Sequence, residues 1–209
     1  MIAGRAAGPP SGLDVRAVVL VEGTSDKLAL EALAERRGRA LDAEGGVSIV
    51  PMGGATNIGR FLDLFGPLGL NVRLAGLCDA DQEGYFRRGL ERVGFGPNLS
   101  RATMEALGFY RCVADLEDEL IRSLGPASVE RILDSQGELR SFRTFQRQPA
   151  QRGRSAEAQL HRFVGTGSGR KGHYARLLVE ALDLTRVPQS LDRVLAHICC
   201  GVSEMRSGC

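Results

Sequence analysis

The sequence predicts an α/β protein built on a parallel sheet, and three observations support this fold class. Short apolar runs alternate with segments of helical periodicity between residues 16 and 124. The apolar runs are rich in Val, Leu and Ile, which is typical of strands that are buried on both faces. The connections between them are short. This alternation predicts a sheet of about four parallel strands, flanked by helices that cross over in the right-handed sense.

The elements of this sheet can be assigned in chain order. The expected strands are 16–21, 47–50, 72–77 and 109–113. The expected helices around them are 25–37, 56–68, 83–93 and 115–124. After Gly125 the pattern is helical only, with expected helices at 126–135, 155–164, 169–182 and 191–199, while 140–154 reads as a loop or a broken helix. The sequence thus predicts a sheet domain followed by a helical C-terminal extension.

Composition sets limits on the class of protein. The 209 residues are 43% hydrophobic and 25% charged, an ordinary globular composition that allows one domain with an appended segment. We expect a loose tail at 1–14, a core at 15–125 and a helical, basic extension at 126–209 packed on that core. No apolar run approaches the roughly 20 residues of a membrane helix. The N-terminus has no signal-peptide core and the five cysteines have no C-x-x-C spacing, so a cytoplasmic location is expected.

Charge is distributed unevenly along the chain. Residues 1–138 contain 15 Lys and Arg against 20 Asp and Glu, whereas 139–176 contain nine against one. An acidic part followed by a basic part suits a metal site beside a groove for a polyanion, and the alternative is a solvated basic helix. The basic stretch contains Arg140, Arg143, Arg147, Arg152, Arg154, Arg162 and Arg170, and all of these except Arg162 are the candidate nucleic-acid contacts.

Aromatic and histidine side chains lie within or near this basic stretch. Phe142 and Phe145 are candidates for base stacking, with core packing as the favoured alternative. For His161 and His173 a structural role or a phosphate contact is favoured over a role as metal ligand, and His197 is expected to be packed.

Acidic side chains recur where the predicted strands end. They are Glu22, Asp26, Asp79, Asp81 and Glu117. In open parallel sheets ligands bind outside the carboxyl ends of the strands, so these carboxylates are expected to meet. Gathered carboxylates repel each other, and divalent cations such as Mg²⁺ or Mn²⁺ relieve that repulsion; two such ions support phosphodiester hydrolysis. Each residue taken alone has a structural alternative. Asp26 alone could be an acid favoured in the first turn of a helix, and Asp79 and Asp81 alone could be loop or cap residues.

A glycine-rich loop follows the second strand. In Gly53-Gly54-Ala55-Thr56-Asn57 the two glycines allow the backbone to approach a phosphate closely, and the next helix N-terminus favours anions. We therefore name Gly53, Gly54 and Asn57 as a candidate phosphate loop. A tight turn with Thr56 or Asn57 as N-cap is the alternative.

These motifs together resemble a known domain. Glu22-Gly-Thr-Ser-Asp26, then Gly53-Gly54-Ala-Thr-Asn57, then Asp79-Ala-Asp81 are similar to the Toprim domain of primases, topoisomerases and OLD (overcoming lysogenization defect) nucleases. The OLD branch is the most similar, and the likeness covers about residues 16–122. It implies that Glu22 and Asp26 bind one metal ion, and that Asp79 and Asp81 bind a second ion or bridge the two.

The same resemblance extends to two further positions. Glu117 matches a glutamate that the OLD branch carries after its fourth strand, although Asp118 and Glu119 leave the choice of acid open. Lys171 in Lys171-Gly-His-Tyr-Ala175 matches a lysine that opens a helix. The resemblance thus implies a bacterial metal-dependent nuclease that uses two Mg²⁺ or Mn²⁺ ions, with DNA as the expected substrate. Its expected catalytic residues are Glu22, Asp79, Asp81 and Lys171.

Other functions of the same fold remain alternatives. A nucleotidyl-transfer module like a primase would use similar carboxylates, and a non-catalytic module would bind nucleic acid alone. Full-length OLD proteins carry an ATPase domain, but Gly165 to Lys171 is not a phosphate-binding P-loop, since no strand precedes it and no Ser or Thr follows the lysine. A separate ATPase partner could supply ATP control.

Overall fold

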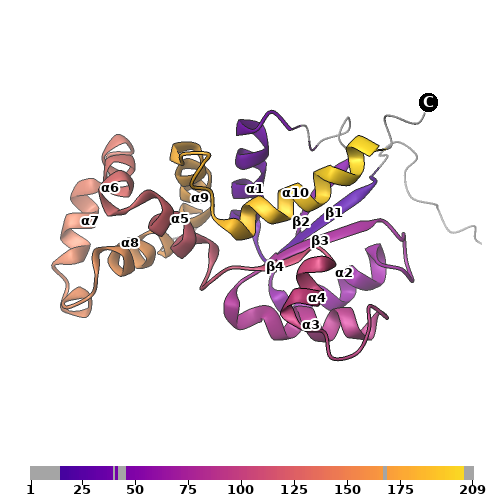
Figure 1. Cartoon of the computed structure of the whole chain (residues 1–209). Coiled ribbons are helices and arrows are strands. Elements are labelled where there is room, and N and C mark those ends of the chain that lie inside the picture. Colours follow the sequence, from indigo (N-terminus) through magenta and orange to yellow (C-terminus); the bar gives the residue numbers. More distant parts are fainter. Residues whose placement is uncertain (1–14, 40, 42–45, 167–168, 205–209) are drawn as a thin grey trace, which may run out of the picture.

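A four-stranded parallel sheet lies at the centre of the protein. The computed structural model describes residues 15–39, 41, 46–166 and 169–204, excluding the side chains of 200–204, so the expected tail at 1–14 lies outside it. The strands are β1 (Ala17–Val21), β2 (Val47–Pro51), β3 (Arg73–Cys78) and β4 (Phe109–Arg111), in the order β2-β1-β3-β4. Since the order places β1 between β2 and β3, the carboxyl ends of these three strands are neighbours (Figure 1).

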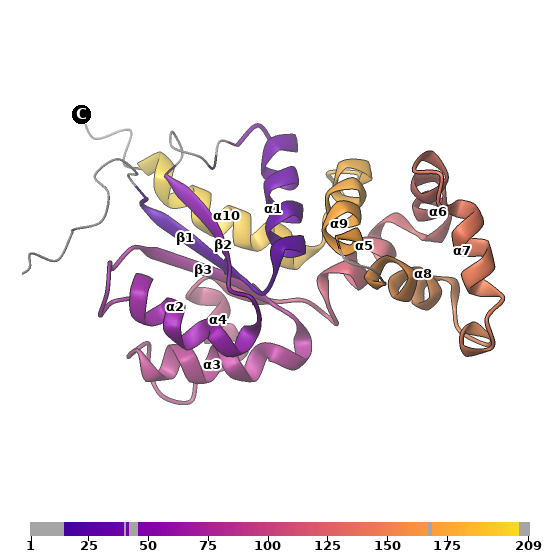
Figure 2. The ribbon, with the colours of Figure 1, turned by 180° about the vertical axis from the view of Figure 1, so that it is seen from behind.

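Helices cover both faces of this sheet, as predicted. One face carries α2 (Ile58–Phe65), α3 (Glu83–Arg92) and α4 (Arg101–Ala106), and the other carries α1 (Thr24–Arg36) and α10 (Gln189–Glu204) (Figures 1 and 2). Side chains of β1 alternate between the two faces: Val18 and Leu20 join the α2–α4 side, while Val19 and Val21 join the α1 side. Full burial on both faces explains why β1 is a continuous apolar run.

Close packing on the α2–α4 side requires a glycine in β3. A Cβ placed on Gly76 would lie 2.6 Å from the ring of Phe109, whose edge meets the Phe86 ring at a centroid distance of 6.3 Å. Side chains of this size fit here because the backbone of β3 can approach them.

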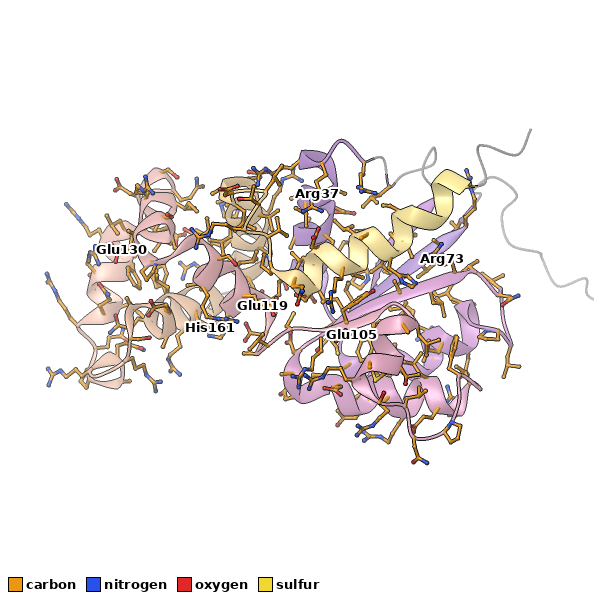
Figure 3. The ribbon with its side chains drawn as sticks, viewed as in Figure 1. Arg37, Arg73, Glu105, Glu119, Glu130 and His161 are labelled. Carbon is orange, nitrogen blue, oxygen red and sulfur yellow. The ribbon has the colours of Figure 1, made fainter. Side chains whose placement is uncertain are left out.

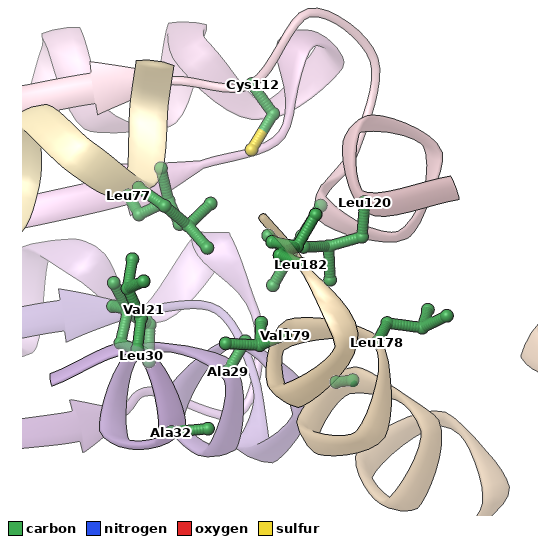
Figure 4. Close-up of a cluster of buried hydrophobic side chains, with 14 of the residues drawn as sticks. Val21, Ala29, Leu30, Ala32, Leu77, Cys112, Leu120, Leu178, Val179 and Leu182 are labelled. Atoms are coloured by element: carbon green, nitrogen blue, oxygen red, sulfur yellow. The ribbon is translucent and has the colours of Figure 1, made fainter. Parts of the chain in front are cut away.

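The remaining helices form a lobe beside the sheet. They are α5 (Leu116–Leu124), α6 (Pro126–Ser135), α7 (Leu139–Gln146), α8 (Ala156–Gly165) and α9 (Arg170–Ala181). Helix α9 packs along α1 and α5, and it therefore joins the lobe to the sheet domain. Figure 4 shows this junction, where Ala29 of α1 lies near Val179 of α9. Apolar packing at this junction holds the two parts together.

The sequence-based assignment agrees with the structure in most elements. All four strands and the parallel sheet are confirmed, and 140–154 is a broken helix, with α7 followed by a short 3-10 turn at Pro149–Gln151. Phe142 is fully buried against Phe163, which supports core packing over base stacking. Helix α4 was not predicted; Ser100 caps it by accepting a hydrogen bond from the Thr103 N–H.

Two further observations concern the cysteines and the hydropathy of the helices. Cys78 and Cys112 are buried free thiols, and Cys199 is a free, half-buried thiol. Among the described residues, none of the helices has both the length and the hydropathy needed to cross a membrane.

Candidate metal centre

The ends of β1 and β3 are joined by a side chain of the predicted site. Glu22 follows β1, and its Oε1 accepts a hydrogen bond of 2.8 Å from the backbone N–H of Asp79, the residue that follows β3. The pKa of Glu22 is raised, first by burial and then by the charge of Asp81, although the Asp79 N–H and Lys171 lower it. The two strand ends therefore bring Glu22, Asp79 and Asp81 into one acidic environment.

Asp26 adds a buried carboxylate from the first turn of α1. It is 8% exposed, and its Oδ2 accepts a 2.8 Å hydrogen bond from the Gly23 N–H. This bond completes a capping arrangement, so the first-turn role expected for an acid here is present. The pKa of Asp26 is nevertheless raised to about 6, chiefly by burial and then by the charges of Glu117 and Glu22, against the lowering effects of the Gly23 N–H and Lys171. Asp26 therefore also belongs to the acidic cluster.

The pKa of Asp79 is strongly raised. Its pKa is raised to about 7, mainly by burial and then by Glu22, Asp26 and Asp115, while Lys171 lowers it. Asp81 belongs to the 3-10 turn Ala80–Gln82, and its exposed side chain lies at the solvent side of the same group. A carboxylate with so high a pKa is destabilised in its charged form, and a bound cation would restore that form.

Glu117 reaches the cluster from the lobe. It lies in the first turn of α5, is 2% exposed, and its Oε2 lies 3.1 Å from Nζ of Lys171. Its Oε1 is buried and has no hydrogen-bond partner. A buried carboxylate oxygen without a partner is energetically costly, so it is suited to face a cation.

The two acids beside Glu117 have other partners. Glu119 accepts a 2.7 Å hydrogen bond from the Val113 N–H and a second, short one from the Ser190 hydroxyl. Asp118 pairs with Arg122 at 2.7 Å. Helical spacing turns both side chains away from the direction of Glu117, and Glu117 is the one of the three with a buried oxygen that lacks a partner.

Lys171 opens α9 at the edge of the cluster. Burial lowers its pKa, but Glu117, Asp26 and Asp79 together outweigh burial, so the net pKa is raised. Its side chain is 47% exposed. Lys171 is therefore a charged ammonium that contacts a buried carboxylate and also reaches solvent.

Asp115 and His161 complete the surroundings of Glu117. Asp115 was not predicted as a site residue, and for His161 a structural role or a phosphate contact was expected. Asp115 caps α5, and its Oδ2 lies 2.7 Å from Nε2 of His161 on α8. Ligand atoms of Asp115, Glu117 and His161 all lie within 4.8 Å of one another. Asp115 precedes Glu117 by two residues, so its position was a usable signal, whereas His161 is 46 residues away from Asp115 in the chain.

The glycine loop after β2 lies next to Glu22. The Gly54 N–H donates to the Glu22 carbonyl oxygen at 3.0 Å, and Gly53 and Gly54 have φ values of 71° and 118°. The Asn57 amide donates to the carbonyl oxygens of Met52 and Gly53, so Asn57 fastens the loop rather than capping α2 with its side chain. The turn alternative is thus present, and a phosphate role for the loop stays a prediction.

The predicted nucleic-acid arginines have different environments. Arg143 is paired with Glu130 and Arg170 with Glu138, whereas Arg140, Arg147 and Arg152 are exposed. A surface pocket of about 600 Å³ beside the cluster includes three arginines and His161 in its lining. The pocket residues are Asp118, Arg122, Arg154, Ser155, Glu157, Ala158, His161 and Arg162.

The residues present fit divalent metal ions. Their oxygen-rich donor set suits Mg²⁺ and Mn²⁺, and two further features would favour the binding of a cation. The first is the partnerless Oε1 of Glu117. The second is the raised pKa of Asp26 and Asp79, to about 6 and about 7.

Comparisons with known proteins agree with this geometry. The family described as "Overcoming lysogenization defect protein-like, TOPRIM domain" matches residues 15–81, which contain Glu22, Asp26, Asp79 and Asp81. Comparison with curated proteins gave no match.

Solved structures extend the likeness beyond those residues. The C-terminal region of the Xanthomonas campestris pv. campestris OLD protein has a TM-score of 0.70 at 23% identity, covering 92% of this chain and 96% of that one. The C-terminal region of the Burkholderia pseudomallei OLD protein has a TM-score of 0.68 at 21% identity, covering 90% and 98%. Residues 15–81 thus match the OLD-like Toprim domain family, and the chain as a whole has the fold of the C-terminal region of OLD proteins.

Proposed function

We propose that this protein is a metal-dependent nuclease that hydrolyses nucleic-acid phosphodiester bonds, with DNA as the expected substrate. One observation carries the proposal: carboxylates from β1, α1, β3 and α5 converge beside Lys171, and Glu117 has a buried oxygen with no partner. A Toprim domain of the OLD family implies a nucleic-acid-related, metal-binding function. Within this broad function, we propose that the reaction is phosphodiester hydrolysis.

The carboxylates divide into two groups by their position. We assign Glu22 and Asp26 to one ion and Asp79 and Asp81 to a second, with Glu117 contributing its free oxygen. When bound, two such cations polarise a phosphate and lower the pKa of a water molecule. Asp79 has a pKa of about 7 without metal, so it binds a cation readily near neutral pH at a small cost in proton release.

Lys171 is assigned to the scissile phosphate. Its ammonium already lies 3.1 Å from Oε2 of Glu117, which leaves Oε1 of the same carboxylate for a cation. The half-exposed side chain can therefore contact a phosphate oxygen while it stays beside the centre. A positive charge at this position stabilises the negative charge that builds up during hydrolysis.

Nucleic acid is proposed to approach along the arginine-lined pocket of α5 and α8. Arg154 and Arg162 are exposed, and Arg122 shares the same pocket with His161, close to the cluster. Of the six sequence-predicted arginines, Arg154 lines this pocket and is joined there by Arg162, whereas Arg143 and Arg170 are paired with carboxylates. Arg122 is also paired, with Asp118. A separate ATPase partner that controls this activity is part of the proposal.

Binding should depend steeply on salt if these arginines contact phosphates. An Arg154→Ala/Arg162→Ala double variant is expected to lower the slope of log Kd against log salt concentration by roughly one unit per lost phosphate contact. Arg92→Ala, which removes a surface arginine paired with Asp63 on the sheet side, is the control and should keep the wild-type slope. Fluorescence anisotropy with a labelled duplex measures both. An unchanged slope in the double variant would exclude this surface.

The function itself is tested with supercoiled plasmid. We expect nicked or linear products in the presence of Mg²⁺ or Mn²⁺, and no products after chelation with EDTA. Binding without cleavage under all metal conditions would instead favour the non-catalytic alternative. Nucleotide incorporation into a primed template would favour nucleotidyl transfer.

A further inference from the structure

His161 lies beside Asp115 and Glu117 of the candidate metal centre, although it belongs to α8 and Glu117 belongs to α5. It is placed on α8, and Figure 3 shows it in the part of the lobe where α8 approaches α5. Its Nε2 is 2.7 Å from Oδ2 of Asp115. The side chain is 37% exposed, and it also lines the surface pocket of about 600 Å³. An ion from solvent can therefore reach its ring nitrogen.

The Glu117 carboxylate beside His161 has one oxygen without a hydrogen-bond partner, and a bound cation would be a partner for it. Glu117 is 2% exposed and its Oε1 forms no hydrogen bond, while the ligand atoms of Asp115, Glu117 and His161 lie within 4.8 Å of one another. Lys171 satisfies only the other oxygen, Oε2. A cation placed among these three side chains would satisfy the free oxygen.

We propose that His161, with Asp115 and Glu117, binds one of the metal ions through its Nε2 atom. The inference rests on the proposed function for the role of Glu117, and it adds a nitrogen ligand to a centre otherwise made of oxygen. Imidazole is a better ligand for transition-metal ions than for Mg²⁺. The ligand set thus favours Mn²⁺ over Mg²⁺ at this position. Coordination through Nε2 requires that nitrogen to be unprotonated, so a proton carried there is released to solvent when the metal binds.

The test uses Mn²⁺ alone, without nucleic acid, and protein free of any histidine tag. Electron spin-echo envelope modulation of bound Mn²⁺ detects a directly coordinated imidazole nitrogen. The chain has three histidines, so each can be assigned by substitution. We expect imidazole ¹⁴N modulation in the wild type and its loss in His161→Asn. His173→Asn is the matched control and should keep the signal, because His173 is exposed and contacts Gln136.

A binding titration gives an independent readout. His161→Asn is expected to weaken Mn²⁺ binding by at least the roughly 10- to 100-fold that loss of an outer-shell partner costs, and to weaken Mg²⁺ binding less. If His161→Asn melts well below the wild type, His161→Gln, which keeps a hydrogen-bonding side chain near Asp115, replaces it.

The outcomes separate this inference from the proposed function. Mn²⁺ binding without imidazole modulation in the wild type overturns the role of His161 and leaves the nuclease proposal intact. Modulation that persists in His161→Asn has the same meaning. Absence of any Mn²⁺ or Mg²⁺ binding overturns both.

Discussion

Asp79→Ala and Glu22→Ala are expected to abolish plasmid cleavage without unfolding the protein. Both residues follow strand ends, and the Glu22 carboxylate accepts a hydrogen bond from the Asp79 N–H. Each substitution therefore removes one carboxylate ligand from the centre. A metal contribution of several kcal/mol corresponds to a fall in rate of about three decades or more. Cleavage at the wild-type rate by both variants, in protein free of contaminating nuclease, would exclude this site. Asp63→Ala removes a surface acid paired with Arg92, and it should cleave normally.

The stability of the metal-free protein provides a second test of Asp79, with a different substitution. Asp79 has a pKa of about 7 in the folded protein against 3.8 ordinarily, chiefly because it is buried. The folded state therefore binds more protons than the unfolded state between these pH values, and stability falls as pH rises from about 4 to about 7. Asp79→Asn removes this loss, so its melting temperature without metal should equal or exceed that of the wild type at pH 8. A clear decrease would show that Asp79 has a structural role.

Lys171→Arg is expected to bind DNA normally and to cleave it 100- to 1000-fold more slowly. The substitution keeps the charge but replaces a compact ammonium with a larger, planar group, which fits poorly beside a buried carboxylate at 3.1 Å. The loss corresponds to the roughly 3–4 kcal/mol that one well-placed electrostatic contact provides in a transition state. Single-turnover cleavage of a labelled duplex measures the rate, and anisotropy measures binding.

The chain offers a matched control for this change. Lys27 is the other lysine, and it pairs with Glu31 across one turn of α1 at 3.7 Å on the surface. Lys27→Arg should cleave at the wild-type rate, because surface pairs of this kind contribute at most about 1 kcal/mol. Wild-type cleavage by Lys171→Arg would assign Lys171 to the surface as well.

Local sequence patterns predicted most of the sheet domain. Continuous apolar runs such as 17–21 can only be satisfied by burial on both faces, so they indicated parallel strands directly. Acids at strand ends followed from the same reasoning, and Glu22 and Asp79 lie together as expected. Helix α4 was missed because it spans only six residues, and its one clear signal is the capping residue Ser100.

The extension shows what short-range patterns leave open. Phe142 and the basic side chains around it suggested either base stacking or packing, and only the contact with Phe163 at 5.2 Å decides for packing. Similarly, Arg143 and Arg170 counted as free cations in the sequence, but Glu130 and Glu138 lie against them in the fold. Charge content is a local property, whereas charge availability depends on partners that are distant in sequence.

The sequence by itself determined the α/β class, the strands and the acidic strand ends, because periodicity and burial act over a few residues. The tertiary structure alone decided how α8 and α9 meet α5. That packing pairs Lys171 with Glu117 and His161 with Asp115, across 54 and 46 residues of chain. Such pairs depend on the packing of apolar helix faces such as those of α1 and α9, which fixes the positions of polar side chains that no local pattern relates.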